Sequence, residues 1–229
     1  MDWRIPILGL ATAFSCTTIG DVALAKAVVV RSIGPSAKAY PPGKALPDSA
    51  KILLQQGDSV TVVGGNSART LRGPGTFPAA AGGAQELAMA ASRRSRFGAM
   101  RSGELALNPS PWNLDVTQSG TVCATGKSLK IWRPESDQAA KLTITKGSGP
   151  ATTVNWPAGK STIDWPTALP ITEGADYQLA LAGGAETQSI RFAVLPAIPA
   201  EATDTAEALV AHGCQNQLDV LVDALGTDE

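Results

Sequence analysis

The stretch from Pro111 to Pro134, PWNLDVTQSGTVCATGKSLKIWRP, decides the fold. A turn at Gly120 separates two strand patterns, and a third strand pattern ends in Trp132. The stretch also holds Cys123, one of the two cysteines expected in the mature chain; the other, Cys214, lies in a helical pattern near the C-terminus. We expect these two to form a disulfide that attaches a C-terminal helix to a β-sandwich.

The composition is that of a globular chain built from many short elements. Hydrophobic residues make up 44% and charged residues 17% of the 229 residues, and 23 glycines and 16 prolines supply turns. This length gives room for one or two domains with proper cores. The formal net charge is −1, and this balance predicts no nucleic-acid partner.

Downstream of Trp112 the chain alternates between short strand patterns and turns. Gly, Pro, Ser and Asp clusters separate the strand patterns at the spacing typical of an all-β sandwich. Alternation such as that of Leu142 and Ile144 with Lys141 and Thr143 predicts antiparallel sheets with one wet face. The expected strands are Asn113–Gln118, Thr121–Ala124, Ser128–Arg133, Lys141–Thr145, Thr153–Trp156, Ser161–Asp164, Tyr177–Ala182 and Ser189–Leu195.

The segment LPITEGADYQL, residues 169–179, resembles the corner before the penultimate strand of immunoglobulin-like and fibronectin type III domains. In those domains a Gly-containing turn precedes a Tyr whose hydroxyl bonds back to the backbone, and the resemblance implies this role for Tyr177. Trp132, on an early strand, is the expected core aromatic. Antibody domains carry their second cysteine where this chain has Leu179, so the resemblance is to the wider class.

The N-terminal part reads as a smaller β unit. Strand patterns cover 27–30, 51–54 and 59–63, and Gly64-Gly65-Asn66 supplies the positive-φ residues of a tight hairpin whose return strand is 67–72. The sequence ILLQQGDSVTVVGGNSARTLRGPGTF resembles the FecR-type periplasmic domain, in which a Gly-Asp step leads into a strand and a hairpin. This resemblance covers roughly residues 27–78. It implies a non-enzymatic role in envelope sensing or regulation.

Residues 1–25 are interpreted as an export signal. An apolar run over 5–20 precedes Ala-Leu-Ala at 23–25, which fits the small-x-small rule for cleavage. Cleavage after Ala25 leaves Lys26 as the mature N-terminus of a periplasmic or secreted protein. Two alternatives stay open, namely lipidation at Cys16 and an uncleaved anchor, and only these imply a membrane association.

Residues 79–110 are expected to form a linker that contains a basic helix over 85–100. Its second half is the most basic spot in the chain and is carried by Arg93, Arg94, Arg96 and Arg101. One interpretation is a contact for an anionic partner or for lipid headgroups. The other is a solvated face, or an intramolecular partner for the acidic C-terminus.

The C-terminal segment predicts one amphipathic helix. Asp204 or Thr205 is placed to cap it, and Gly226 follows its expected last residue, Leu225. Residues 201–229 contain seven carboxylates and no Lys or Arg. Cys214 falls on the apolar face, which supports the disulfide; closing a loop of about 90 residues contributes about 4 kcal/mol in the chain-entropy account. The apolar face comprises Val210, Cys214, Leu218, Leu221 and Leu225.

No catalytic constellation emerges from the residue types. A serine hydrolase is disfavoured because the sequence contains no Gly-x-Ser-x-Gly elbow. Metal sites built from His and Cys lack ligands, because His212 is the only histidine. No Asp or Glu pair stands out, which leaves a carboxylate-based hydrolase as a remote alternative. The sequence predicts no cofactor and no metal.

Three tryptophans adjoin prolines at strand ends: Trp112, Trp156 and Trp165. Large aromatics of this kind plug the ends of a small sandwich. Alternatively, Trp156 and Trp165 stack on a glycan, as in carbohydrate-binding modules.

The sequence thus predicts a mainly β, exported, non-enzymatic protein that binds an envelope protein partner. Its expected parts are an export signal at 1–25, a FecR-like β unit at 26–78, the linker at 79–110, an immunoglobulin-like β-sandwich at 111–196, and an acidic C-terminal helix at 197–229 packed on the sandwich through the Cys123–Cys214 disulfide.

Overall fold

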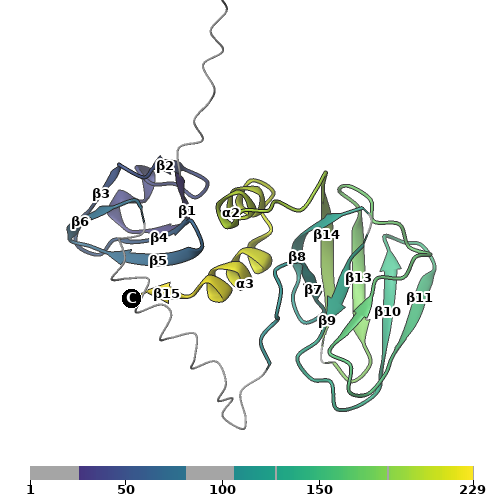
Figure 1. Ribbon diagram of the computed structural model, residues 1–229. Coiled ribbons are helices and arrows are strands. Elements are labelled where there is room, and N and C mark those ends of the chain that lie inside the picture. The colour runs from purple at the N-terminus through teal and green to yellow at the C-terminus, as the bar shows by residue number, and fades with distance from the viewer. Residues whose placement is uncertain (1–25, 81–105, 127, 185, 229) are drawn as a thin grey trace, which may run out of the picture.

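The computed structural model describes residues 26–80, 106–126, 128–184 and 186–228 (Figure 1). Within these ranges the chain is mainly β, with two helices near the C-terminus, which confirms the predicted fold class. The expected export signal and the expected helix over 85–100 lie outside the described residues. No helix in the described part of the chain is long and apolar enough to cross a membrane.

The N-terminal β unit consists of a five-stranded sheet and a two-stranded ribbon. The sheet has the order β15-β5-β4-β1-β2. Its hairpin β4–β5 is present as predicted, but of Gly64, Gly65 and Asn66 only Gly65 has a positive φ, of +57°. Val29, Val60 and Val62 of the sheet pack against Ile52 and Leu54 of the ribbon. The elements are β1 (Lys26–Ile33), a 3-10 turn η1 (Pro35–Lys38), β2 (Ala45–Pro47), β3 (Lys51–Leu54), β4 (Ser59–Gly64), β5 (Ser67–Arg72), β6 (Gly75–Pro78) and β15 (Thr227–Asp228), with β3 and β6 forming the ribbon.

The Gly57-Asp58 step forms a turn in which the buried Asp58 connects two loops. The Asp58 carboxylate is only 3% exposed and accepts hydrogen bonds from the backbone N–H groups of Ser36 and Gln55. Gly57 has a φ of +86°, a left-handed conformation that favours glycine. Gly34 is required for a steric reason as well, because a Cβ at this position would lie 2.6 Å from an Asp58 carboxylate oxygen.

The second β unit is a sandwich of a five-stranded and a three-stranded sheet. All eight strands expected from the sequence are present, with somewhat different ends. The larger sheet has the order β11-β10-β13-β14-β8 and the smaller has β12-β9-β7. The strands are β7 (Asn113–Asp115), β8 (Gly120–Thr125), β9 (Lys130–Trp132), β10 (Ala140–Lys146), β11 (Ala151–Trp156), β12 (Thr162–Asp164), β13 (Asp176–Leu181) and β14 (Thr187–Leu195).

Aromatic rings dominate the sandwich core. Trp165, Tyr177 and Phe192 pack edge to face, with ring centroids 5.1–5.4 Å apart. The Tyr177 hydroxyl donates to the carbonyl of Pro170 at 2.7 Å, so the backbone bond expected of this corner is present. Trp132 is buried, as expected, but the tryptophans of the central cluster are Trp156 and Trp165.

The C-terminal segment forms two helices, so the prediction of one continuous helix is wrong. α2 (Ala202–Ala211) and α3 (Gln215–Leu225) are separated at Gly213, whose φ of +70° ends the first helix. Glu201 precedes α2 as its N-cap, and neither of the two expected capping residues holds that position. The predicted end is confirmed, because Gly226 caps α3 with a φ of +74°.

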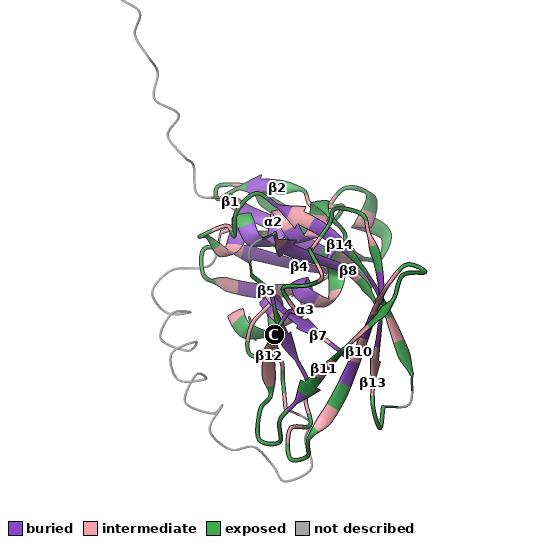
Figure 2. Ribbon diagram, turned by 90° about the vertical axis from the view of Figure 1, so that its right-hand side faces the viewer, coloured by how far each residue is buried: buried purple, intermediate pink, exposed green. Residues whose placement is uncertain are grey.

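The break lets the two helices contact both β units rather than the sandwich alone. α2 packs on β1 and β4, whereas α3 packs on β8 and β5. Figure 1 shows both helices between the two units, and Figure 2 shows buried positions of β1 and β4 beside α2. One apolar cluster spans the junction: Val30, Val63 and Ala68 from the N-terminal sheet, Cys123, Ala193 and Leu195 from the sandwich, and Ala206, Leu209, Cys214, Leu218, Leu221 and Val222 from the C-terminal segment.

Candidate functional site

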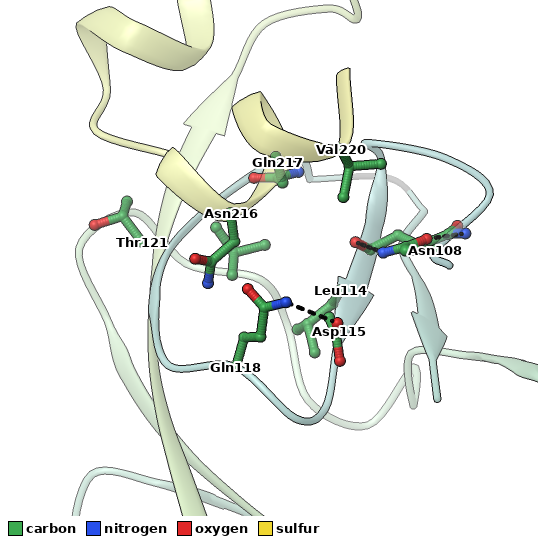
Figure 3. Close-up of a pocket in the computed structure, with 10 residues that line it drawn as sticks. Asn108, Leu114, Asp115, Gln118, Thr121, Asn216, Gln217 and Val220 are labelled. Atoms are coloured by element: carbon green, nitrogen blue, oxygen red, sulfur yellow. Dashed lines mark hydrogen bonds between the residues drawn. The ribbon is translucent and has the colours of Figure 1, made fainter. Parts of the chain in front are cut away.

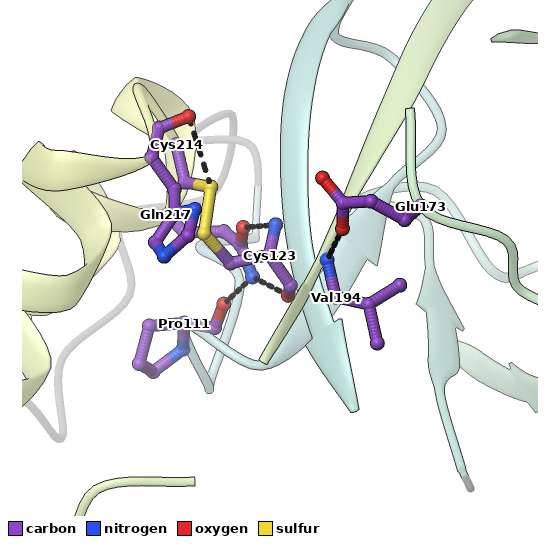
Figure 4. The surroundings of a disulfide bond; sticks show 7 residues. Pro111, Cys123, Glu173, Val194, Cys214 and Gln217 are labelled. Carbon is purple, nitrogen blue, oxygen red and sulfur yellow. Dashed lines mark hydrogen bonds between the residues drawn. A yellow bond between two sulfur atoms is a disulfide. The ribbon is translucent and has the colours of Figure 1, made fainter. Parts of the chain in front are cut away.

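The junction is centred on the disulfide that the sequence predicts. Cys123 on β8 and Cys214, immediately before α3, are bonded, with their Cα atoms 5.8 Å apart (Figure 4). Both cysteines are fully buried. The bond therefore joins the edge of the sandwich to the helix pair at the centre of the apolar cluster.

Gln217 forms three hydrogen bonds to the backbone next to the disulfide. Its side-chain oxygen accepts from the Cys123 N–H at 2.6 Å, and its Nε2 donates to the Cys123 carbonyl at 2.9 Å and to the Pro111 carbonyl at 2.7 Å (Figure 4). β8 is the last strand of its sheet, so its outer backbone groups have no neighbouring strand. The amide of Gln217, which is 4% exposed, replaces that strand.

Ion pairs hold the helices to the N-terminal sheet. Lys26 at the start of β1 contacts Asp204 at 3.1 Å and Glu207 at 2.5 Å on α2, and Arg31 pairs with Asp219 on α3. The hydrogen bonds from Lys26 to Glu207 and then to Asp204 raise its pKa above the usual value. These three carboxylates of the acidic C-terminus thus have cationic partners on β1.

A small cavity lies under α3, between it and the first strands of the sandwich (Figure 3). Its volume of about 20 Å³ suits a single water molecule. Gln118 donates to Asp115 across its rim. A second, open hollow of about 320 Å³ lies between Leu107–Pro109 and the outer side of α3. The small cavity is lined by Asn108, Asn113, Leu114, Asp115, Gln118, Thr121, Val122, Asn216, Gln217 and Val220.

The positions of Trp156 and Trp165 agree with the first interpretation, in which they plug the sandwich, and contradict the alternative of a glycan platform. Trp156 is fully buried, and its indole N–H donates to the Lys160 carbonyl at 2.8 Å. Trp165 is 7% exposed and donates to the Leu169 carbonyl at 2.6 Å. Because both ring faces lie in the core, neither tryptophan can stack on a sugar, and both serve to fill the sandwich. Trp112 is half-buried against the junction cluster.

A buried arginine supports Trp156 from the end of β9. Arg133 is 3% exposed, lies 4.9 Å from the Trp156 ring centroid, and donates to backbone carbonyls that include those of Gln138 and Pro157. Burial lowers its pKa below the usual value. The sequence reasoning did not assign a role to Arg133, although it shares the alternation of Leu129 and Ile131, both of which are buried.

The remaining candidate residues do not converge on a site. His212 is exposed and ends α2, so it does not share a helix with Cys214. The basic residues Arg93, Arg94, Arg96 and Arg101 lie outside the described residues. Among the residues that are described, no group of three or more His, Cys, Asp or Glu is placed to hold a metal ion.

No protein-family model matches the chain, and no curated protein matches it.

Proposed function

We propose that the protein is an exported, non-enzymatic module for protein–protein interaction or sensing in the bacterial cell envelope. The observation that carries this proposal is the junction, in which a buried disulfide and two helices hold two β units together. Disulfides of this kind form and persist in oxidising compartments such as the periplasm. A junction that fixes two β units relative to one another suits a protein whose function is to present surfaces to a partner.

The strand order of the sandwich supports the immunoglobulin-like interpretation. β10, β13 and β14 lie side by side in one sheet, as strands C, F and G do in that fold, and β9 and β12 lie in the other sheet, as B and E do. β11 extends the first sheet beyond β10, as an extra strand does in variable-type domains. Domains of this architecture commonly act in recognition at cell surfaces.

The N-terminal unit supports the FecR-like interpretation through its Gly-Asp step. Asp58 joins the loop before β4 to the turn after β1, which gives that step a structural role. The resemblance implies a regulatory or sensing task, and nothing in the described contacts of this unit requires a chemical one.

The ionisable groups with shifted pKa values all have structural roles. Lys26 faces α2, Asp58 holds a turn, Arg133 fills the core, and Asp176 pairs with Arg191 at 2.7 Å on the outer face of the sandwich. Each shift follows from a contact that holds structure together. No described carboxylate pair therefore favours the alternative of a carboxylate-based hydrolase.

The compartment is tested by the intact mass of the protein recovered from its native host, before and after reduction and alkylation. We expect a chain that begins at Lys26 and gains two alkyl groups only after reduction. A chain that retains Met1 and carries freely alkylated Cys123 and Cys214 would contradict export, and the envelope role would fall with it.

The interaction is tested by cross-linking in intact cells, followed by affinity purification from envelope extracts. The control is the same cross-linking and purification carried out on cells that lack the protein. We expect a specific envelope protein that is recovered with the wild type and absent from the control. If the wild type and the control recover the same background proteins, the proposed function is wrong.

A further inference from the structure

One long strand edge in the described part of the chain is left uncovered. The edge of β8 is covered by α3 through Gln217 and through Asn216, which donates to the Ser119 carbonyl at 3.0 Å. The edge of β5 is extended by β15. β11, in contrast, ends its sheet with six residues and pairs only with β10. Figure 1 shows it at the rim of the sandwich, away from the helices.

The register of the sheet shows which backbone groups of β11 point outward. Ala182 donates to the carbonyl of Lys141, so alternate residues of β10 starting with Lys141 bond to β13. The intervening residues of β10 then bond to β11, where their partners are Thr152, Val154 and Trp156. The N–H and C=O groups of Ala151, Thr153 and Asn155 therefore point away from the sheet.

This edge lacks the features that usually prevent pairing with another strand. Native edges are protected by charged side chains, by proline within the strand, or by short length. The β11 sequence ATTVNW contains no charge and no proline; Pro150 and Pro157 flank it and only set its ends. The other open edges are shorter: β2, β7 and β12 have three residues each, and β3 and β6 of the two-stranded ribbon have four.

We propose that β11 pairs antiparallel with β11 of a second copy of this chain, about a two-fold axis at Thr153. This register uses all the outward backbone groups, because Thr153 faces its own copy and Ala151 faces Asn155 of the partner. Thr152 then faces Val154 of the partner, a pair of β-branched residues that are each half-exposed in the single chain. The sheets β11-β10-β13-β14-β8 of the two copies then form one continuous sheet across the two-fold axis.

The β11 sequence favours β11 of a second copy as the strand that pairs with this edge. Self-pairing places no like charges opposite one another and brings Thr153 opposite Thr153 at the axis. Pairing through a single strand buries less surface than a stable obligate dimer. The dimer is therefore reversible and depends on concentration. It requires no envelope partner, so it stands or falls independently of the proposed function.

Sedimentation velocity of the mature, disulfide-bonded protein over a range of concentrations tests the proposal. We expect the average mass of the wild type to rise toward twice that of the monomer. Thr153→Lys and Thr153→Glu place like charges opposite one another across the axis, so each variant alone stays monomeric. Their equimolar mixture restores the dimer, because Lys then faces Glu. Gln178→Lys, on the exposed face of the central strand β13, is the matched control and dimerises like the wild type.

Hydrogen exchange gives a second measurement that does not depend on the variants. The amides of Thr153 and Asn155 are expected to exchange more slowly as the concentration rises, while those of Thr152 and Val154 change little. A wild type that is monomeric at every concentration overturns the proposal. So does a dimer that both charged variants leave intact, or a mixture that fails to restore pairing.

Discussion

The side-chain amide of Gln217 pairs with both backbone groups of Cys123, accepting from its N–H at 2.6 Å and donating to its C=O at 2.9 Å. The same residue of β8 is covalently bonded to Cys214, three positions before Gln217. One turn of α3 thus attaches to one residue of the sandwich by a covalent bond and by a strand-like pair of hydrogen bonds. The attachment matters beyond the sandwich, because the same helix pair also packs on the N-terminal sheet.

Replacement of Gln217 by Leu leaves the backbone groups of Cys123 and the carbonyl of Pro111 buried without partners. An unsatisfied buried polar group costs about 1–3 kcal/mol, so we expect a loss of about 2 kcal/mol or more in the free energy of unfolding. Urea denaturation measures it. The matched control is Gln215→Leu, at an exposed position in the same helix turn, with an expected change within about 0.5 kcal/mol. Equal midpoints for the two variants would contradict the role given to Gln217.

The disulfide closes a loop with a sequence separation of 91 residues. In the chain-entropy account a loop of this size contributes about 4 kcal/mol, so the Cys123→Ser, Cys214→Ser variant is expected to lose stability on that scale. Because the C-terminal helices contact both β units, we expect both units to lose protection from hydrogen exchange. Thermal unfolding of the wild type and the variant measures the loss of stability. Hydrogen exchange measures the protection of each β unit. Loss of protection confined to the sandwich would show that the N-terminal sheet does not depend on the helices.

The sequence predicted those parts of the fold that depend on local patterns. Alternating residues between Gly, Pro and Ser clusters marked the eight sandwich strands. The expectation that Cys16 is removed with an export signal left one intramolecular connectivity for the other two cysteines. The corner tyrosine was also identified correctly, because its Gly-containing turn precedes it directly in the chain. In each case the signal lies within a few residues of the feature, or in a count that leaves no alternative pairing.

The errors arose where the outcome depends on distant residues. Periodicity through Val210, Cys214 and Leu218 suggested one helix, since the apolar face continues across Gly213 and all three residues do pack in the junction cluster. Gly213, whose φ is +70°, marks the break locally, but the continuous apolar face concealed it. The contact of α2 with β1, by contrast, depends on residues far apart in the sequence. Trp156 and Trp165 were ambiguous for a similar reason, because a tryptophan beside proline looks the same in a core and on a binding surface.

The hydroxyl of Tyr177 is expected to contribute through one hydrogen bond, since its ring is held independently by Trp165 and Phe192. Tyr177→Phe keeps the ring and leaves the Pro170 carbonyl without this donor, so we expect a loss of about 1 kcal/mol. Tyr177→Ala also opens a cavity among the aromatic rings and is expected to cost about 3–5 kcal/mol. Chemical denaturation of both variants separates the hydrogen bond from the packing. Equal losses would show that the hydroxyl makes the main contribution.

Asp58 is expected to make stability fall in acid. Burial of its carboxylate opposes ionisation, but hydrogen bonds from Ser36 and Gln55 outweigh it and lower the pKa below the usual 3.8. A carboxyl whose pKa is lower in the folded than in the unfolded state stabilises the folded state above pH 3.8. This stabilisation disappears as the pH falls through the pKa of the carboxyl in the folded state. Asp58→Asn is therefore expected to be less stable than the wild type at neutral pH, with a difference that narrows below about pH 4.

Urea midpoints measured between pH 7 and pH 2 provide this comparison. Asp176 contributes in the same direction, because its hydrogen bonds to Arg191 also lower its pKa. Adding Asp176→Asn to Asp58→Asn is therefore expected to reduce the acid sensitivity further, by a small amount because the pair is exposed. Asp164→Asn is the control, since Asp164 forms an exposed pair with Lys130 and such pairs contribute little. A difference in urea midpoint between wild type and Asp58→Asn that stays constant across this pH range would contradict the prediction. It would mean that the negative charge of Asp58 does not stabilise the turn.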